Sequence, residues 1–356
     1  MKTTLSGLIP QDFEEVFNGK NIRLFVLKNS NGCEVCICNF GATLLSFVVP
    51  DKNGKMTDIT LGQTSVKSYI EVPDRFFSTS VGRYSNRIAG GKFSIDGHEY
   101  TLPINNDINN LHSGSTGFHN CCWDLVKSTS NSLILVHVSP DGEGGFPGTL
   151  TTTQTWTLTE ENELIFHNYA TTDKATPCSI TSHAFFNLEG DFTKDCLSTN
   201  LKMYSHFYCP ADQHMIPTGE LRPVQNTPFD FLEFHKIGER ISANDEQIKI
   251  GSGYDHTYVI DKKVFGELSL AASAYSEVTG IQLDVLTTLP GVQLYTGNFL
   301  DGFPGKQGTT NDRRHGFCLE AQFFPDSPNH GYFPSSILRP GQCYDHTIIF
   351  KASIHS

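Results

Sequence analysis

The sequence predicts an all-β protein, a large antiparallel β sandwich. Short segments rich in β-branched and aromatic residues follow one another along the chain. Turn signals such as Asp96-Gly97 and Pro340-Gly341 separate these segments. Helical periodicity is scarce by comparison. Repeated short strands with tight turns and few helices are typical of a sandwich.

Ten segments carry the strand signal most clearly. In each of them apolar, β-branched or aromatic side chains predominate, and turn residues stand at the ends. In chain order they are residues 22–29, 34–40, 43–49, 132–139, 150–159, 163–170, 256–261, 280–288, 292–297 and 346–353. The best candidate for a helix is the segment FHKIGERI, residues 234–241.

The domain organisation is predicted to be simple. No low-complexity linker, charge run or alignable internal repeat divides the 356 residues. Large β folds can form one domain at more than about 200 residues. We therefore expect residues 1–356 to form a single domain.

The charge balance argues against a nucleic acid or an anionic membrane as a partner. Asp and Glu number 38 and Lys and Arg number 26, which gives a formal net charge of −12. The basic residues also form no cluster. No run of about 18 apolar residues indicates a membrane span. The first residues, MKTTLSGLIPQDFEEV, have no apolar core long enough for a signal peptide.

The ten cysteines are interpreted as reduced thiols. The segment CEVCIC, residues 33–38, has the look of half a zinc site. A zinc site needs a second Cys or His pair at a similar short spacing, and none lies near it. The chain also has no Asn-x-Ser/Thr glycosylation acceptor. Both observations favour a reducing cytoplasm over secretion.

Several common chemistries are excluded because their motifs are missing. The sequence has no G-x-G-x-x-G after a strand, no H-E-x-x-H and no G-x-S-x-G. The segment GFPGKQGTT, residues 302–310, contains Gly-Lys, but it is too short for a phosphate-binding loop. Gln307 also stands where Ser or Thr would bind magnesium. We therefore expect no cofactor and no metal.

One carboxylate interrupts an apolar strand near the C-terminus. In HGFCLEAQFFPD, residues 315–326, alternate apolar side chains from Phe317 to Phe323 share one face of the predicted strand. Glu320 points to the other face. It either faces water or lines a polar cleft where it exchanges protons.

Other polar side chains have the same two explanations. His183 interrupts the strand-like SITSHAFFNLEG, and Asn86 and Arg87 precede two glycines in GRYSNRIAGGKF. His112 lies in a loop rich in Asn, Ser and Gly, and Asp255 opens a strand. Each alone is explained as a core histidine, a solvated arginine or a turn residue. Together they suit a sugar site, because amide, carboxylate and guanidinium groups bind hydroxyls while His and Glu exchange protons.

Ten motifs, in the same order, resemble those of the aldose 1-epimerase (galactose mutarotase) family, its animal members in particular. The resemblance runs from about residue 20 to the C-terminus. The motifs are GATLLSF, GRYSNRIAGGKF, NNLHSG, SPDGEGGFPG, ITSHAFFNLEG, IPTGE, GYDHTY, LPGVQLYTGNFLDG, GFCLEAQFFPD and LRPGQCYDHT. The resemblance implies a large twisted antiparallel β sandwich, the galactose mutarotase-like supersandwich, with the active site in a cleft on its concave side.

The resemblance also implies a reaction and the residues that perform it. Family members interconvert the α and β anomers of free hexoses such as galactose and glucose, without cofactor or metal. Glu320 is then the general base that removes the proton of the C1 hydroxyl, and His183 is the general acid that protonates the ring oxygen. His112 assists near the ring oxygen and C1. The positions that match the family's hydroxyl-binding residues are Asn86, Arg87, Asp255 and Gln293.

The chemistry fits this division of roles. Anomer exchange needs proton removal at one oxygen of the acetal carbon and proton delivery at the other, so an acid and a base must flank that carbon. Histidine titrates near neutral pH, and a neighbouring carboxylate favours its protonated form. The family pattern is broken at four positions, none of them a proposed catalytic group: Ser113, Ser182, Phe185 and Ala321.

Three alternatives stay open at this point. A hexose-6-phosphate 1-epimerase should need several cations for the phosphate, and only Arg87 is a cation placed by a motif. A non-catalytic sugar-binding or regulatory protein would be expected to lose Glu320 or His183. A glycosidase would use Asp255 and Glu320 as its two carboxylates. No single residue of the sequence indicates which hexose is preferred. We expect a monomer, with a dimer as the alternative.

Overall fold

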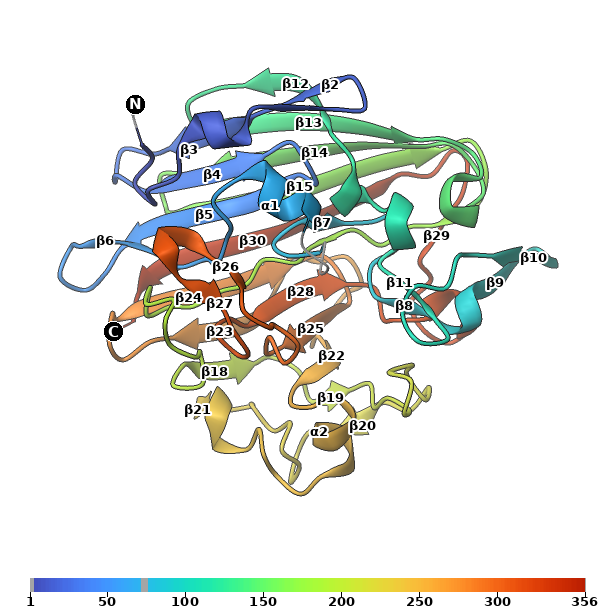
Figure 1. Ribbon diagram of the computed structural model, residues 1–356. Helices are drawn as coiled ribbons and strands as arrows, with labels where there is room; N and C mark the ends of the chain where they lie inside the picture. Colours follow the sequence, from blue (N-terminus) through green and yellow to red (C-terminus); the bar gives the residue numbers. More distant parts are fainter. Residues whose placement is uncertain (1–2, 72–75, 356) are drawn as a thin grey trace.

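Antiparallel β-strands dominate the computed structural model, which describes residues 3–71 and 76–355, and this confirms the predicted fold class (Figure 1). The largest sheet has nine strands. In spatial order these are β12 (Asp124–Ser128), β13 (Ser132–Ser139), β14 (Leu150–Leu158), β15 (Glu163–Thr172), β30 (Tyr344–Ile354), β24 (Ile281–Thr287), β23 (Ser269–Tyr275), β18 (Asn200–Met203) and β21 (His235–Lys236). The last strand in the sequence, β30, therefore joins two half-sheets.

Two smaller sheets have five and four strands. The five-stranded sheet contains, in spatial order, β20 (Arg222–Pro223), β19 (Phe207–Tyr208), β22 (Asp255–Val259), β25 (Gly291–Tyr295) and β28 (Cys318–Gln322). The four-stranded sheet contains β3 (Leu24–Lys28), β4 (Glu34–Cys38), β5 (Thr43–Pro50) and β6 (Met56–Asp58).

The segment 183–187 links the two smaller sheets into one layer. Phe186 forms antiparallel bridges both to Thr60, just after β6, and to Phe317, just before β28. The backbone N–H of Leu61 donates to the carbonyl of Phe185 at 2.9 Å on one side, and the N–H of Phe186 donates to the carbonyl of Phe317 at 2.7 Å on the other. This link fixes His183 beside the start of β28.

Short pairs and turns complete the structure. The two-stranded pairs are β1 (Glu15–Phe17) with β2 (Lys20–Ile22), β7 (Ser80–Val81) with β17 (Thr181–Ser182), β8 (Arg87–Ile88) with β11 (Asn110–Leu111), β9 (Lys92–Ile95) with β10 (His98–Thr101), β16 (Thr176–Pro177) with β29 (Ile337–Leu338), and β26 (Phe303–Pro304) with β27 (Thr310–Asn311). The α-helices of the described residues are α1 (Val66–Glu71) and α2 (Glu246–Ile250). No helix in this part of the chain is long and apolar enough to cross a membrane.

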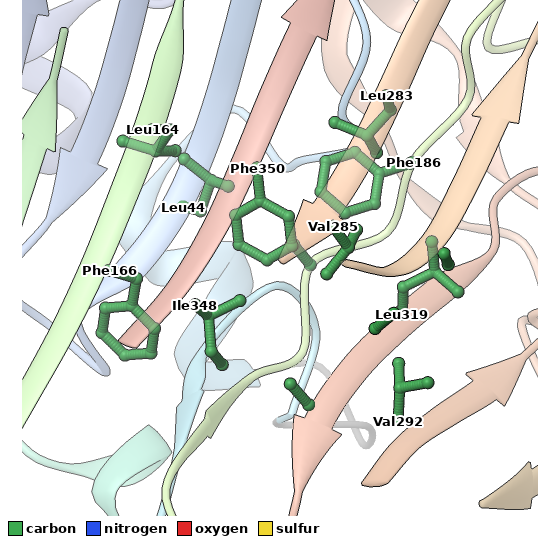
Figure 2. Close-up of a cluster of buried hydrophobic side chains, with 14 of the residues drawn as sticks. Leu44, Leu164, Phe166, Phe186, Leu283, Val285, Val292, Leu319, Ile348 and Phe350 are labelled. Carbon is green, nitrogen blue, oxygen red and sulfur yellow. The ribbon is translucent and has the colours of Figure 1, made fainter. Parts of the chain in front are cut away.

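The main core lies between the nine-stranded sheet and the layer formed by the smaller sheets. Figure 2 shows Leu164, Ile348 and Phe350 of the large sheet in one buried cluster with Leu44 of β5 and with Val292 and Leu319 of β25 and β28. This burial removes a large apolar area from water and is the main stabilising contribution to the fold.

Alternation is clear in the large sheet and absent from the layer that faces it. Along β14 buried and more exposed residues alternate from Leu150 to Leu158. In contrast, every residue of β4, β25 and β28 is buried. Both faces of these strands are covered, so the interpretation in which Glu320 faces water is wrong.

The predicted helix at residues 234–241 is also wrong. Strand β21 occupies its beginning, and a single 3₁₀ turn, Ile237–Glu239, follows. The backbone N–H groups of Ile237 and Gly238 donate to the carbonyls of Thr199 and Leu197 at 3.0 and 2.9 Å. Because these donors are used by a distant segment, tertiary contacts override the local helical pattern.

We expect His137, a core-facing residue of β13, to make stability fall in acid. Burial lowers the pKa of His137 to about 4, and the rings of Phe118 and Trp123 lie 5.4 Å from its ring. Between about pH 4 and pH 6.5 the unfolded chain therefore binds a proton at this position that the folded protein does not, so the free energy of unfolding rises with pH. His137→Phe should gain stability relative to the wild type by about 1.4 kcal/mol for each pH unit below about 6.5.

Urea denaturation of both proteins from pH 7.5 to pH 4.5 measures this difference. A difference in unfolding free energy that is constant across this range would contradict the assignment of a neutral, buried His137.

Candidate active site

A polar cleft of about 660 Å³ brings together six of the seven predicted site residues. Its lining includes Asn86, Arg87, His112, His183, Asp255 and Glu320. The seventh, Gln293, lines a small adjoining recess that also contacts Asn86, Arg87 and Asp255. The residues come from distant parts of the sequence and meet because the strands that carry them are neighbours.

The predicted acid and base face one another at this cleft. Nε2 of His183 lies 3.8 Å from Oε1 of Glu320, and the side chains are only 9% and 3% exposed. The His112 ring centre lies 5.4 Å from that of His183. Proton-exchanging groups held this close, with little water around them, interact strongly with one another and with a substrate.

Strand register explains how Glu320 reaches the cleft beside the hydroxyl-binding candidates. In the five-stranded sheet Glu320 of β28 pairs with Gln293 of β25, and Gln293 pairs with Thr257 of β22. Asp255 lies two residues before Thr257, on the same face of β22. Side chains that are far apart in the sequence therefore form one polar row across the sheet.

This polar row is joined by hydrogen bonds. Nε2 of Gln293 donates to Oδ1 of Asp255 at 2.7 Å, and Oε1 of Gln293 accepts a short hydrogen bond from the hydroxyl of Thr257. Burial raises the pKa of Asp255, and the nearby Arg87 opposes this effect. These contacts orient the amide of Gln293 and tie it to Asp255, which lines the cleft.

His112 is held as a neutral imidazole. Its Nδ1 accepts a hydrogen bond of 3.0 Å from the backbone N–H of Asn86, so the ring proton is on Nε2. Burial, together with the charges of His183 and Arg87, keeps the pKa of His112 well below its ordinary value. His112 is therefore a hydrogen-bond donor through Nε2. In a positively charged ring Nδ1–H would point at the backbone N–H of Asn86, and two donors would face each other.

The loops that carry Asn86 and His112 adopt left-handed backbone conformations. The φ angles are 65° for Asn86, 53° for His112 and 66° for Ser113. Residues other than glycine adopt this backbone conformation only where surrounding contacts stabilise it. Ser113 supplies part of this support, because its hydroxyl accepts from the backbone N–H of Tyr84 at 2.9 Å and donates to the Tyr84 carbonyl at 3.1 Å. These two bonds hold the Ser113 side chain against the backbone of Tyr84.

Arg87 is buried at the cleft wall, so the interpretation of a solvated loop arginine is wrong. It is 9% exposed, and its Nε donates to Oδ1 of Asn106 at 3.0 Å. The backbone N–H of Asp326 donates to the Arg87 carbonyl at 2.8 Å, and the carboxylate of Asp326 accepts from the N–H of Ala89 at 2.9 Å. Asp326, in the motif that also carries Glu320, thus anchors the strand that carries Arg87.

Aromatic side chains form part of the cleft, and the sequence analysis assigned them no role. Phe76, Tyr295, Phe299 and Phe303 all belong to the lining. The Tyr295 and Phe299 rings stack at 6.4 Å, and Phe76 lies 4.6 Å from the His112 ring. The C–H faces of sugars pack on such surfaces. The signal was available, because Tyr295 and Phe299 stand in LPGVQLYTGNFLDG.

Three site residues have the composition of a metal site, but their protonation does not fit one. One ligand atom each from His112, His183 and Glu320 lie within 4.8 Å of one another, and two imidazoles with a carboxylate can bind zinc. A metal at Nε2 of His112 would move the ring proton to Nδ1, against the N–H of Asn86. These residues are therefore poorly arranged for a resident metal.

Activity should accordingly survive metal removal. Incubation with EDTA followed by dialysis should leave the rate of the expected anomer exchange within about 20% of the untreated value, because the acid and base roles expected for His183 and Glu320 require no metal. Polarimetry before and after treatment measures this rate. Loss of activity that added zinc restores would contradict the expectation.

Comparison with known proteins identifies relatives along nearly the whole chain. Residues 23–351 match the family model described as Aldose 1-epimerase. The galactose mutarotase of Rattus norvegicus is 38% identical over 94% of this chain and 95% of its own length. The aldose 1-epimerase of Escherichia coli K12 is 36% identical over 92% and 94%. The crystal structure of an aldose epimerase homologue from C. elegans has a TM-score of 0.86 at 30% identity and covers 94% of this chain and 99% of that one.

An all-β sandwich with a buried His183–Glu320 pair in a polar cleft, together with these relatives, defines a sugar isomerase. The chain belongs to the aldose 1-epimerase family. It is an epimerase that interconverts the anomers of hexoses.

Proposed function

We propose that this chain accelerates the mutarotation of free hexoses, galactose and glucose among them, by acid–base catalysis at Glu320 and His183. The observation that carries the proposal is the 3.8 Å separation of His183 Nε2 and Glu320 Oε1 in the polar cleft of a family member. At this separation His183 and Glu320 can contact the two oxygens bonded to C1 of the sugar, which are the ring oxygen and the C1 hydroxyl.

The proposed reaction moves one proton in each direction. Glu320 takes the proton of the C1 hydroxyl while His183 gives its Nε2 proton to the ring oxygen, and the C1–O5 bond breaks. The open-chain aldehyde rotates about its C1–C2 bond. The ring then recloses on the other face of the carbonyl, and the protons return. His112, neutral with its proton on Nε2, supports the ring oxygen as a hydrogen-bond donor.

The cleft favours an uncharged sugar over a sugar phosphate. Among the described lining residues Arg87 is the one Lys or Arg, while Asp107, Asp255, Asp301 and Glu320 contribute carboxylates. A phosphate would meet repulsion from these carboxylates and one strong cation. The hexose-6-phosphate alternative is thus disfavoured by charge, and the family assignment disfavours the glycosidase.

Polarimetry on freshly dissolved α-D-galactose tests the proposal directly. The protein should speed the approach to anomeric equilibrium, whereas a non-catalytic sugar binder would not. Values of kcat/KM for galactose and glucose would then define the preferred hexose, and galactose 6-phosphate should be the poorer substrate.

We also propose that residues 1–356 form a single domain that acts as a monomer in the cytoplasm. The main core includes residues from Leu27 to Ala352, which supports one cooperative unit. All ten cysteines are free thiols, and burial raises the pKa of Cys36 to about 12, which keeps it inert. Thiol counting under denaturing, non-reducing conditions and light scattering test these points, with a disulfide or a dimer as the contrary results.

Arg87 and Asp255 should contribute to sugar affinity. Arg87→Ala and Asp255→Ala should each raise KM, because each removes a charge-assisted hydrogen bond to a sugar hydroxyl. The expected loss of binding free energy is about 1.5–3 kcal/mol for each variant. Arg313→Ala, which removes an exposed arginine outside the cleft, is the matched control and should leave KM unchanged. Steady-state kinetics on the three folded variants measure this, and wild-type kcat and KM in both site variants would contradict it.

A further inference from the structure

The general acid His183 has a second neighbour on the strand that carries the general base. Sγ of Cys318 lies 3.5 Å from Nδ1 of His183, within hydrogen-bonding distance for sulfur. Cys318 and Glu320 are two residues apart on β28, so their side chains leave the strand on the same side. One strand therefore supplies a group to each nitrogen of the His183 ring.

The ring plane and the backbone of His183 are fixed by other contacts. Phe185 stacks on the imidazole at 5.1 Å with an interplanar angle of 25°, and Tyr295 meets it edge-on at 6.0 Å. The backbone N–H of His183 donates to the carbonyl of Thr79 at 2.9 Å. These contacts fix the plane, but flat aromatic surfaces do not distinguish Nδ1 from Nε2. A polar neighbour at one nitrogen makes that distinction.

A sulfur atom at Nδ1 leaves Nε2 as the nitrogen that delivers the proton. The ring can give up its Nε2 proton only if it also carries a proton on Nδ1, because it would otherwise become an anion, and Sγ of Cys318 can accept a hydrogen bond from that Nδ1–H while Nε2 lies 3.8 Å from Glu320. A carboxylate in the same place would hold the positive charge of a protonated ring and make it a poorer proton donor. A neutral thiol orients the ring without holding the charge.

We propose that Cys318 is a positioning residue for the general acid: its thiol holds the His183 imidazole with Nε2 toward Glu320 and the sugar. This inference rests on the proposed roles of Glu320 and His183. Cys318 is buried in a hydrophobic cluster that also contains Phe185 and Tyr295. The proposal gives this cysteine an effect on the rate of catalysis in addition to its packing.

Three substitutions separate this role from simple core packing. Cys318→Ala removes the hydrogen-bonding partner of Nδ1, whereas Cys318→Ser keeps a group of similar shape that can accept and donate hydrogen bonds. Cys196→Ala removes the same atoms from a fully buried cysteine of the main core and is the matched control for cavity formation. We expect Cys318→Ala to lower kcat about 10-fold with KM nearly unchanged, a size typical of groups that orient a reacting residue. Cys318→Ser should recover most of that loss, and Cys196→Ala should keep the wild-type kcat.

Nitrogen-15 NMR of the histidine rings supplies a readout that packing alone would not change. In the wild type and in Cys318→Ser the Nδ1 resonance of His183 should be that of a hydrogen-bonded nitrogen, and in Cys318→Ala it should shift. Wild-type kcat in Cys318→Ala, or an equal fall in Cys196→Ala, would overturn the inference, as would an unchanged Nδ1 resonance. The proposed function would survive any of these results provided that Glu320→Gln is inactive, so the two proposals fail separately.

Discussion

Glu320→Gln should lower kcat by about two orders of magnitude or more while sugar affinity changes little. Glutamine keeps the shape of the side chain and an oxygen that accepts hydrogen bonds, but it cannot take the proton of the C1 hydroxyl. General base catalysis typically contributes about 10²–10⁴-fold, and a loss confined to kcat marks an interaction made in the transition state. Polarimetric rates with galactose, from a variant whose folding is verified by circular dichroism, measure the effect.

Two further variants test whether Glu320 works together with His183. His183→Asn should produce a fall of similar size, and the double variant should be far less than multiplicatively worse, because both groups act on one ring opening. Glu34→Gln changes a buried glutamate outside the cleft, with 1% of its surface exposed, and should keep the wild-type rate. Mutarotation near the wild-type rate in folded Glu320→Gln would refute the mechanism.

Lys306→Met should destabilise the protein by about 3–5 kcal/mol, the loss typical of removing one partner of a buried ion pair. Nζ of Lys306 lies 2.5 Å from Oδ2 of Asp58, with the side chains 1% and 5% exposed, and it also donates to the Leu45 carbonyl at 2.8 Å. Burial raises the pKa of Asp58 and lowers the pKa of Lys306, and the attraction within the pair opposes both effects. Without the lysine, the Asp58 carboxyl must lose its charge or remain buried without a counterion.

A second substitution should restore most of this loss. In the Lys306→Met/Asp58→Asn protein the new amide keeps an oxygen that can accept from the backbone N–H groups of Phe47 and Thr60, and the uncompensated charge is removed. Arg339→Met breaks the exposed Arg339–Asp96 pair instead, where the side chains are 47% and 60% exposed. It should change stability by less than about 1 kcal/mol. Urea denaturation measures all three, and equal stability of Lys306→Met and the double variant would contradict the role of charge.

The local sequence pattern predicted the strands well, because the alternation of apolar and polar side chains depends only on residues that are adjacent in the sequence. The segment at 132–139 coincides with β13, and the one at 346–353 lies within β30. The same reasoning failed at residues 234–241, where the carbonyls of Leu197 and Thr199 capture backbone donors from across the fold. A helical pattern carries no information about such distant acceptors.

The site shows the same division between local and long-range information. The resemblance supplied the candidate residues, but no pattern placed Glu320 against His183, since that contact depends on the bridge between Phe186 and Phe317. Cys318 was grouped with the other thiols because its relation to His183 appears only after the strands have paired. Lys306 was considered only as part of a rejected phosphate loop, and its buried partner Asp58 is 248 positions away in the sequence.

The central place of β30 has a consequence for synthesis of the chain on the ribosome. β30 pairs with β15 on one side and β24 on the other, yet it follows every other strand of its sheet in the sequence. Translation proceeds at about 5–20 residues per second, so roughly ten seconds or more pass between the synthesis of β15 and the addition of residue 344. During this time the edge of β15 that later pairs with β30 is open, and an open strand edge is a template for aggregation. The growing chain therefore carries an open strand edge until β30 is made and joins the two half-sheets.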